Sequence, residues 1–422
     1  MARARGISWV WIVFVAVIGA LLIGAGTFLT AKLAAPAPPA DVSINVPATL
    51  LVDGAAPPSI PIPARGSFAL ATSLSGTVAS GNPAVVRPIG SVAKAMTALV
   101  VLAAHPLAPG ASGPGVTMTG ADVLLYRQAV AQGGSNLRVH AGEVLTERDL
   151  LLALMLPSAD NIAETLAVWV SGNRASFVAS LNVTASAMGM GHTRFADPSG
   201  LSAATVSTAG DLVVLARAVT ANAALIELVG VRQAALPDGT VLHNLDILLG
   251  TQPGWLGIKT GWTGVAGGCL LFAASMVYAS GRAVTVWGAV LGQPPLTAGD
   301  PQHPELGEAF VSARSAAVAA LRGYAAVDLA GLSPQLSGSI STRWGGSSLV
   351  LLAAHASDVV LVRSGALLRI RVTSLATHAP LPGGTTVGEI TGLLDAKTSI
   401  TWNVVSASDI AGPSPWWKLF SS

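Results

Sequence analysis

The stretch "GSVAKAMTALVVL", residues 90–102, is the point from which the fold can be assigned. Charged residues make up only 10% of the chain, yet Lys94 lies among small and apolar residues, three positions after Ser91. On a helix, residues three apart share a face, so the hydroxyl and the ammonium can approach within hydrogen-bonding distance. Burial disfavours the charged ammonium, and a neutral amine can accept the serine proton. The alternative is a helix-capping Ser91 beside a Lys94 that extends into solvent.

Two later stretches extend this pattern. In "LMLPSADNIAETLA", residues 154–167, Ser158 lies in a polar break between two apolar helical segments. In "GIKTGWTG", residues 257–264, Lys259, Thr260 and Gly261 lie on a predicted strand. Ser-x-x-Lys, a second serine and Lys-Thr-Gly, in this order, form the motif set of penicillin-binding proteins and serine β-lactamases. Three motifs in one chain are far more specific than any one of them.

The resemblance extends over about residues 65–325. The blocks "VVRPIGSVAKAMTALVVL", "AGEVLTERDLLLALMLPSADNIA", "HTRFADPSGLS", "STAGDLVVLARAV" and "GIKTGWTGVAGG" resemble successive parts of the D-alanyl-D-alanine carboxypeptidases, the low-molecular-mass penicillin-binding proteins. This resemblance implies an α+β transpeptidase fold, an antiparallel sheet with a helical cluster. It also implies removal of the terminal D-alanine from peptidoglycan stem peptides through an acyl-enzyme, without a cofactor and with covalent inhibition by β-lactams.

The resemblance also implies roles for the residues of these motifs. Ser91 corresponds to the nucleophile and Lys94 to its general base. Ser158 corresponds to the residue across the cleft that relays a proton to the leaving D-alanine. Lys259 corresponds to a positive charge beside the nucleophile, and Thr260 to a hydrogen-bond donor for the substrate carboxylate.

The backbone between these motifs has expected roles as well. The resemblance places the oxyanion hole at the backbone N–H groups of Ser91 and Trp262, where charge develops in the tetrahedral intermediate. We expect Gly261 to be glycine because a side chain there would crowd a substrate lying along the strand.

Two departures from the family pattern affect the site. The family usually has Ser-x-Asn, whereas this chain has Asp160 in the third position and Asn161 one place later. We count Asp160 among the substrate-binding residues of this site. An aspartate does not donate through an amide as asparagine does, but it could pair with a lysine and favour the charged form of that lysine, which would work against its function as a base. The region "LGQPPLTAGDPQHPELG", residues 291–307, lacks the arginine that many carboxypeptidases use for the substrate carboxylate.

Composition excludes several other classes of protein. Cys269 is the single cysteine, which excludes an intramolecular disulfide and zinc sites of the Cys-pair type. The histidines show no metal-ligand spacing, so we expect no metal. A net charge of +2 on scattered residues provides no basic patch, and we expect no nucleic-acid partner. We interpret His192 and Asp197 as part of a turn beside the active-site helices rather than as members of a triad.

The N-terminus reads as a membrane or export segment. Arg3 and Arg5 precede an uncharged apolar stretch, residues 7–30, that is long enough to cross a bilayer. Arginines ahead of such a stretch favour a cytoplasmic start and an exported remainder. A small-residue cleavage pattern at residues 35–37 is followed by Pro38, so we expect an uncleaved anchor, with a cleaved signal peptide as the alternative.

Residue patterns and composition change along the chain and indicate several regions. A hairpin is predicted around Ser75 and Gly76, and helices are predicted to start at the Thr146–Asp149 and Thr208–Asp211 pairs, which have capping-box spacing. After about Val327, short strand-like runs indicate a small all-β domain. The predicted regions are a cytoplasmic stub with the apolar segment (1–31), an Ala/Pro-rich linker (32–64), the catalytic domain (65–325), the β domain (326–411) and a Trp-rich tail (412–422).

Two other functions remain open at this point. One is a catalytically weakened envelope scaffold that keeps the fold and binds peptidoglycan or a partner, which Asp160 would favour. The other is a β-lactamase, against which stand the spacer, the extra β domain and the lack of a recognisable glutamate motif for deacylation between Ser158 and Lys259. Fold alone does not separate these functions, because function resides in the site.

Overall fold

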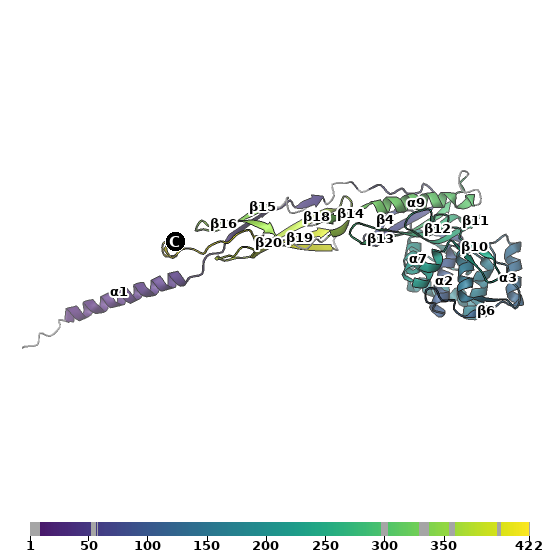
Figure 1. The fold of residues 1–422 in the computed structure, drawn as a ribbon, viewed down its shortest axis with the longest axis horizontal. Coiled ribbons are helices and arrows are strands. Elements are labelled where there is room, and N and C mark those ends of the chain that lie inside the picture. Colours follow the sequence, from purple (N-terminus) through teal and green to yellow (C-terminus); the bar gives the residue numbers. More distant parts are fainter. Residues whose placement is uncertain are drawn as a thin grey trace, which may run out of the picture. The chain divides into compact units, whose positions relative to one another are not determined.

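The computed structural model describes residues 9–51, 56, 58–296, 303–328, 337–353, 359–394 and 398–421 (Figure 1). It divides into two compact units, one formed by Pro57–Ala325 and the other by Met1–Ala56 with Ala326–Ser422. The first unit contains all the motif residues named above.

A five-stranded antiparallel sheet organises the unit Pro57–Ala325. Its strands follow the order β11-β12-β13-β3-β4. The hairpin predicted around Ser75 and Gly76 is confirmed as β3–β4, and every residue of β3 is buried. Figure 1 shows α9 on one side of this sheet and the helical cluster with α2 and α7 on the other. The strands are β3 (Ser67–Thr72), β4 (Gly76–Gly81), β11 (Trp255–Thr263), β12 (Gly267–Val277) and β13 (Ala283–Gln293).

The helical cluster carries most of the motif residues. Its helices are η1 (Gly90–Ala93), α2 (Lys94–Ala104), α3 (Gly120–Ala131), α4 (Glu147–Met155), α5 (Asp160–Ser171), α6 (Arg174–Ala187), α7 (Ala209–Ala221) and α8 (Ala223–Val229), with η2 (Pro304–Leu306) and α9 (Gly307–Arg322) after the sheet. Short ladders pair β5 (Arg87–Pro88) with β8 (Val206–Ser207), β6 (Gly115–Thr117) with β7 (Val144–Thr146), and β9 (Gln233–Ala235) with β10 (Val241–His243).

The two predicted helix starts differ in how they are capped. Thr146 and Asp149 form the predicted reciprocal capping box of α4. At α7, Thr208 accepts from the backbone N–H of Asp211, but the Asp211 carboxylate accepts from His192 N–H and from the Thr193 hydroxyl instead. The second box is therefore half formed, because a neighbouring loop competes for the carboxylate.

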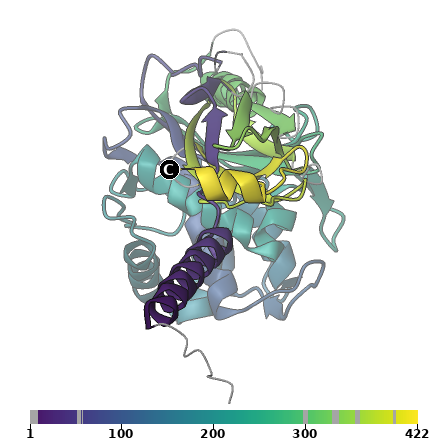
Figure 2. The same ribbon diagram turned by 90° about the vertical axis from the view of Figure 1, so that its left-hand side faces the viewer.

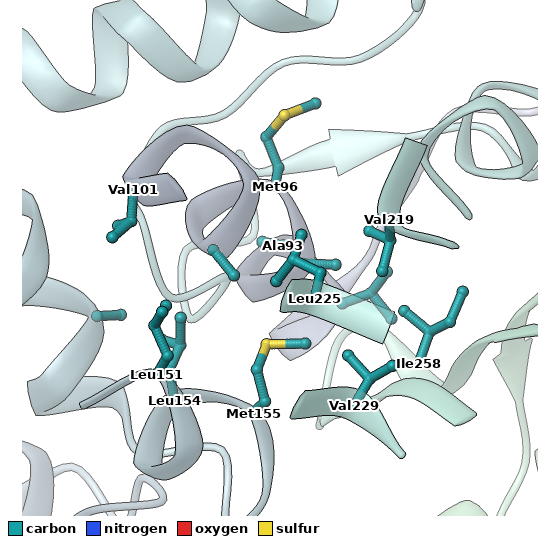
Figure 3. Close-up of a cluster of buried hydrophobic side chains, with 14 of the residues drawn as sticks. Ala93, Met96, Val101, Leu151, Leu154, Met155, Val219, Leu225, Val229 and Ile258 are labelled. Carbon is teal, nitrogen blue, oxygen red and sulfur yellow. The ribbon is translucent and has the colours of Figure 1, made fainter. Parts of the chain in front are cut away.

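An apolar core packs the helical cluster against one face of the sheet. Figure 3 shows where α2, α4, α8 and β11 converge. The labelled side chains are Ala93, Met96, Val101, Leu151, Leu154, Met155, Val219, Leu225, Val229 and Ile258. Lys94 belongs to the same buried stretch and is 0% exposed. An ammonium in such a place is retained only when it is paired and hydrogen-bonded.

The second unit contains a seven-stranded sheet of order β1-β15-β16-β20-β19-β18-β2. Its strands are β1 (Asp41–Asn45), β2 (Thr49–Leu51), β15 (Ser337–Ser341), β16 (Ser347–Leu352), β18 (Leu367–Ser374), β19 (Thr386–Leu394) and β20 (Thr398–Ser406), and the remaining strands are β14 (Tyr324–Asp328) and β17 (Val359–Arg363). The prediction that residues 32–64 are only a spacer is wrong for this part, since β1 and β2 form both edges of the sheet. Val42 and Ile44 alternate toward its core, a period that the surrounding prolines obscured.

Two helices lie at the ends of this second unit. They are α1 (Trp9–Ala34) and α10 (Pro415–Phe420). The α1 helix contains an 18-residue window with a mean hydropathy of 2.6 and has no buried residue. Its length and composition are those of a membrane span or a signal segment. Figure 2 shows α10 next to one end of α1. Lys418 Nζ of α10 donates to the carbonyls of Leu33 (2.8 Å) and Ala35 (2.9 Å) at this end. A lysine thus caps carbonyls that have no partner within the helix.

Candidate active site

The turn that opens α2 brings Ser91 and Lys94 together. Residues Gly90–Ala93 form a 3₁₀ turn, and the α-helix begins at Lys94 rather than at Ser91. The Lys94 Nζ lies 2.8 Å from the Ser91 Oγ, so the approach predicted from their spacing is present. Ser91 is partly exposed, whereas Lys94 is fully buried.

The Lys94 ammonium has three acceptors. Besides the Ser91 hydroxyl, its Nζ donates to Asp160 Oδ1 at 2.5 Å and to the Ser199 carbonyl at 3.0 Å. The alternative that Lys94 extends into solvent is therefore wrong. Both partners of the ion pair are buried: the side chain of Lys94 is 0% exposed and that of Asp160 is 5% exposed. Removing either partner from such a pair leaves an uncompensated buried charge.

Asp160 occupies the first turn of α5, where the helix dipole favours a carboxylate. Its backbone N–H donates to the Ser135 carbonyl at 2.7 Å. A Cβ at Gly134 would lie 2.5 Å from Asp160 Oδ2, so glycine is required for the loop to approach this close. The Asp160 carboxylate thus lies between Lys94 on one side and the loop that follows α3 on the other.

Asn161 does not take the place of the missing Ser-x-Asn amide. Its Oδ1 accepts from the N–H of Leu137, and its Nδ2 donates to the carbonyl of the same residue. These bonds fix the loop that follows α3. The expected site partner of Lys94 in this chain is therefore an aspartate, not a displaced asparagine.

Ser158 is held in an uncommon backbone conformation beside this pair. Its φ is +67°, in the left-handed region, which is unusual for a residue with a side chain. The side chain is 2% exposed, and its Oγ has no hydrogen-bond partner among the described residues. Backbone strain and unpaired buried polar atoms both concentrate at functional sites.

Lys259 on β11 is the second buried lysine of the site. It is 1% exposed, and its Nζ has no hydrogen-bond partner in the described part of the chain. Burial, and then the charge of Lys94, hold the Lys259 pKa well below its ordinary value, while Asp160 and Asp246 act in the opposite direction. Burial thus opposes the positive charge that is expected of Lys259. An arriving substrate carboxylate would favour the ammonium form.

The strand β11 packs directly on the turn that carries Ser91. A Cβ at Gly261 would lie 2.8 Å from Val92 N, 2.9 Å from Ile89 O and 3.0 Å from Ser91 N. The structure gives a second reason for this glycine, beside the substrate contact predicted from the sequence: a side chain would strike the backbone around the nucleophile. The packing excludes even a methyl group.

The Trp262 backbone also lies against the nucleophile turn. A Cβ at Gly90 would be 3.1 Å from Trp262 N. The two backbone segments expected to form the oxyanion hole, those of Ser91 and Trp262, are thus neighbours. The Trp262 side chain is 47% exposed, and Thr260 is buried on the same strand.

The sequence did not single out Ser199 or Gly200, which complete the site. Gly200 has a φ of +83°, and a Cβ there would lie 1.9 Å from the Gly90 carbonyl oxygen. The run "DPSGLS" in a family-like block was the available signal. Asp197 accepts from the Ser199 hydroxyl at 2.7 Å and from Leu201 N at 2.9 Å, whereas His192 is exposed, so these two residues form no triad.

No group of three or more His, Cys, Asp or Glu side chains is placed to hold a metal ion in the part of the chain that the structure describes. Cys269 is buried, and burial raises its thiol pKa to about 11, as expected for an inert thiol. Residues 297–302, within the region that lacks an arginine, lie outside the described residues.

Comparison with known proteins places this geometry in a family. The profile of the D-alanyl-D-alanine carboxypeptidase family matches residues 59–290, more than half of the chain and all the motif residues. The chain belongs to this family. The structure of the Streptomyces K15 DD-transpeptidase, another DD-peptidase, superposes with a TM-score of 0.53 and 26% identity, over 63% of this chain and 99% of that one.

Curated relatives of this carboxypeptidase-family chain carry several related names. A D-alanyl-D-alanine endopeptidase of Pseudomonas aeruginosa is 33% identical over 170 residues, 39% of this chain and 52% of the relative. A D-alanyl-D-alanine carboxypeptidase of Streptomyces sp. strain K15 is 30% identical over 230 residues, 51% of this chain and 77% of the relative. The match thus spans about half the length of the first relative, and the α+β penicillin-binding-protein fold is common to the family.

Proposed function

We propose that this protein is a serine-type D-Ala-D-Ala carboxypeptidase that removes the terminal D-alanine from peptidoglycan stem peptides. The observation that carries the proposal is the 2.8 Å contact between the partly exposed Ser91 hydroxyl and the buried Lys94 amine, inside the region that the family profile matches. A serine is a weak nucleophile unless a base removes its proton, and Lys94 is placed to do so.

Acylation begins when Ser91 Oγ attacks the carbonyl carbon of the D-Ala-D-Ala peptide bond. The carbonyl oxygen becomes negative and is stabilised by the backbone N–H groups of Ser91 and Trp262. The bond to the leaving D-alanine then breaks, and its nitrogen takes a proton by way of the Ser158 hydroxyl. Water repeats the sequence against the acyl-enzyme and releases the shortened peptide.

The lysine and threonine of β11 bind the terminal carboxylate of the substrate. Lys259 takes up a proton as the carboxylate arrives, because the opposite charge stabilises its ammonium form. Thr260 donates its hydroxyl to the same carboxylate. A β-lactam presents a comparable carboxylate and a strained amide, and it forms a covalent adduct with Ser91.

The scaffold and β-lactamase alternatives have less support. The Lys94–Asp160 pair is the one feature in favour of a weakened site, but the bond between Lys94 and Ser91 is retained beside it. The relatives described above are named as an endopeptidase, a carboxypeptidase and a transpeptidase. None of these three is named as a β-lactamase. Carboxypeptidase is the name of the family profile itself.

Two assays on the full chain in detergent test the proposal. The protein is incubated with a fluorescent penicillin, and release of D-alanine is measured from an acylated Lys-D-Ala-D-Ala tripeptide. We expect both activities in the wild type and in Ser186→Ala, an exposed serine on α6, and neither in Ser91→Ala. Labelling without D-alanine release from any stem peptide would favour the scaffold, and rapid loss of the label by hydrolysis would favour a β-lactamase.

We also propose that α1 remains attached as a membrane anchor, with the catalytic unit outside the cytoplasm. Support comes from its hydropathy and from the contacts of Lys418 with Leu33 and Ala35, which would be lost on cleavage near residues 35–37. Trp416 and Phe420 of α10 are 72% and 75% exposed, as expected for side chains at a membrane interface. Mass spectrometry of the membrane-isolated protein should detect peptides from residues 9–34, and their absence would establish cleavage.

A further inference from the structure

We infer that Asp160 is the proton acceptor behind Lys94: it takes the proton that Lys94 must lose before Lys94 can receive the proton of Ser91. This inference rests on the proposed acylation of Ser91. It assigns to the residue that departs from the family pattern a part in proton transfer, in place of a part in substrate binding. The supporting feature is the arrangement of three acceptors around one buried amine.

Every hydrogen-bond donor of the Lys94 ammonium has an acceptor. An ammonium has three N–H donors and no lone pair. All three donors have partners, namely Ser91 Oγ, Asp160 Oδ1 and Ser199 O. In this state Lys94 donates to the Ser91 hydroxyl and has no means of accepting a proton from it. Lys94 becomes a base only after one proton leaves its nitrogen.

Only one of the three partners can keep that proton. A serine hydroxyl about to attack must lose a proton, and a backbone carbonyl does not hold one. A carboxylate can hold the proton: it accepts a hydrogen bond when it is ionised and donates one when it is protonated. Asp160 Oδ1 accepts from Nζ at 2.5 Å, so the proton of this short, charge-assisted bond already points at the carboxylate. Burial favours this exchange, because both groups become neutral together.

The resulting steps balance in protons and charge. A proton moves from Lys94 Nζ to Asp160 Oδ1, and the Ser91 proton moves to Nζ. Ser91 Oγ forms its bond to the carbonyl carbon, and the carbonyl π electrons pass to the oxygen as the oxyanion. When the C–N bond breaks, the leaving nitrogen receives a proton from Lys94 by way of Ser158. Asp160 then returns its proton to Lys94, and the pair is restored.

Asparagine at position 160 would change where this proton goes. An amide does not accept a proton, so Lys94 would have to release it to solution before each acylation. Acylation would then depend on pH. With aspartate the proton stays within the pair, and acylation is insensitive to pH as long as the pair holds one proton between its two groups.

Other charged groups around the pair set the position of any pH profile. Lys259 faces the pair from β11, and Asp246 lies near Lys259. A polar pocket of about 260 Å³ is lined on the other side by Asp160, Glu164, Arg174 and Asp197. Glu164 is paired with Arg174 at 3.1 Å and makes no contact with Lys94 among the described residues. The wild type and Asp160→Asn share all of these groups except Asp160 itself, so a difference between their pH profiles reports on position 160.

The test is the acylation rate constant at saturating fluorescent penicillin, measured by stopped flow on the full chain in detergent. It is measured from about pH 5.5 to about pH 9.5 for wild type, Asp160→Asn and the control Glu164→Gln. We expect the wild-type and control rates to vary by less than about twofold between pH 6 and pH 8. We expect the Asp160→Asn rate to increase about tenfold per pH unit over its acidic limb.

Each outcome has a defined meaning. A wild-type rate that itself increases about tenfold per unit below pH 8 overturns the inference, whether or not Asp160→Asn folds. The same holds if Asp160→Asn is slower by one constant factor at every pH, since that is the signature of a structural role. No acylation of the wild type at any pH would instead contradict the proposed function.

Discussion

The side-chain amide of Asn161 accepts from the backbone N–H of Leu137 and donates to the Leu137 carbonyl, at 2.9 Å each. The preceding residue, Asp160, instead pairs with Lys94. Neighbouring residues of one helical turn therefore serve different purposes. One fixes a loop and the other completes an ion pair. Where the family has one asparagine, this chain thus has two residues with separate contacts. Changing them separately and together tests what each contributes.

The exchange of the two residues should cost stability. In Asp160→Asn/Asn161→Asp the family asparagine is restored, but aspartate at 161 no longer donates to the Leu137 carbonyl and leaves a charge in a buried place. We expect a loss of about 2–4 kcal/mol in the free energy of unfolding of the catalytic unit. Thermal unfolding followed by circular dichroism measures it, with Asp160→Asn alone as the comparison. Equal stability of the two variants would show that the Leu137 bonds contribute little.

Replacing Gly261 by alanine should slow acylation rather than only weaken peptide binding. The added methyl group meets the backbone of residues 89–92 and displaces the nucleophile turn. A shift of this size at a reacting group lowers the rate on the order of 100-fold. The matched control is Gly264→Ala, for which a Cβ meets nothing within 4 Å. Normal penicillin acylation of Gly261→Ala with poor peptide turnover would support the substrate-crowding explanation instead.

Binding of a substrate carboxylate should be accompanied by proton uptake. Since the Lys259 pKa is held well below its ordinary value by burial, the carboxylate shifts it upward on binding. Linkage then requires affinity to increase as pH falls. Calorimetric titration of Ser91→Ala with a D-Ala-D-Ala peptide, in two buffers of different ionisation enthalpy, gives the number of protons taken up. We expect a net uptake of protons by Ser91→Ala and none by Ser91→Ala/Lys259→Met.

Asp246 should make stability depend on pH near the site. Burial raises its pKa from the ordinary value of 3.8 to about 6, against the hydrogen bonds from Trp255 and Leu248. Between these two values the folded state binds more protons than the unfolded state, so this contribution to stability is full at low pH and is lost as pH rises to about 6. The total is about 3 kcal/mol. The difference in melting temperature between wild type and Asp246→Asn should change over this range and become constant above it.

Local sequence signals predicted a good part of this structure. The three-residue spacing of Ser91 and Lys94 was enough to predict their contact, because a helical turn fixes it. The same holds for the capping box of Thr146 and Asp149 and for the β3–β4 hairpin. Each of these features depends on residues a few positions apart.

The remaining features depend on residues that are distant in sequence. The acceptors of Lys94 at Asp160 and Ser199 are 66 and 105 positions away, and no periodicity reports such a contact. The second reason for Gly261 was missed because the neighbour that excludes a side chain is the backbone of another element. Strand β1 was not predicted for two reasons. Prolines surround it in the sequence, and its partner strand β15 begins almost 300 residues later.

The lysine cap on α1 has a consequence for the order of assembly. Lys418 and Leu33 are separated by 385 positions in the chain. During synthesis the carbonyl is made early, and its partner is made only when nearly everything between them has left the ribosome. Water or lipid headgroups must serve the end of α1 during that interval. The contact between α1 and α10 therefore forms only after Lys418 has been synthesised, and a chain that stops before this residue cannot make it.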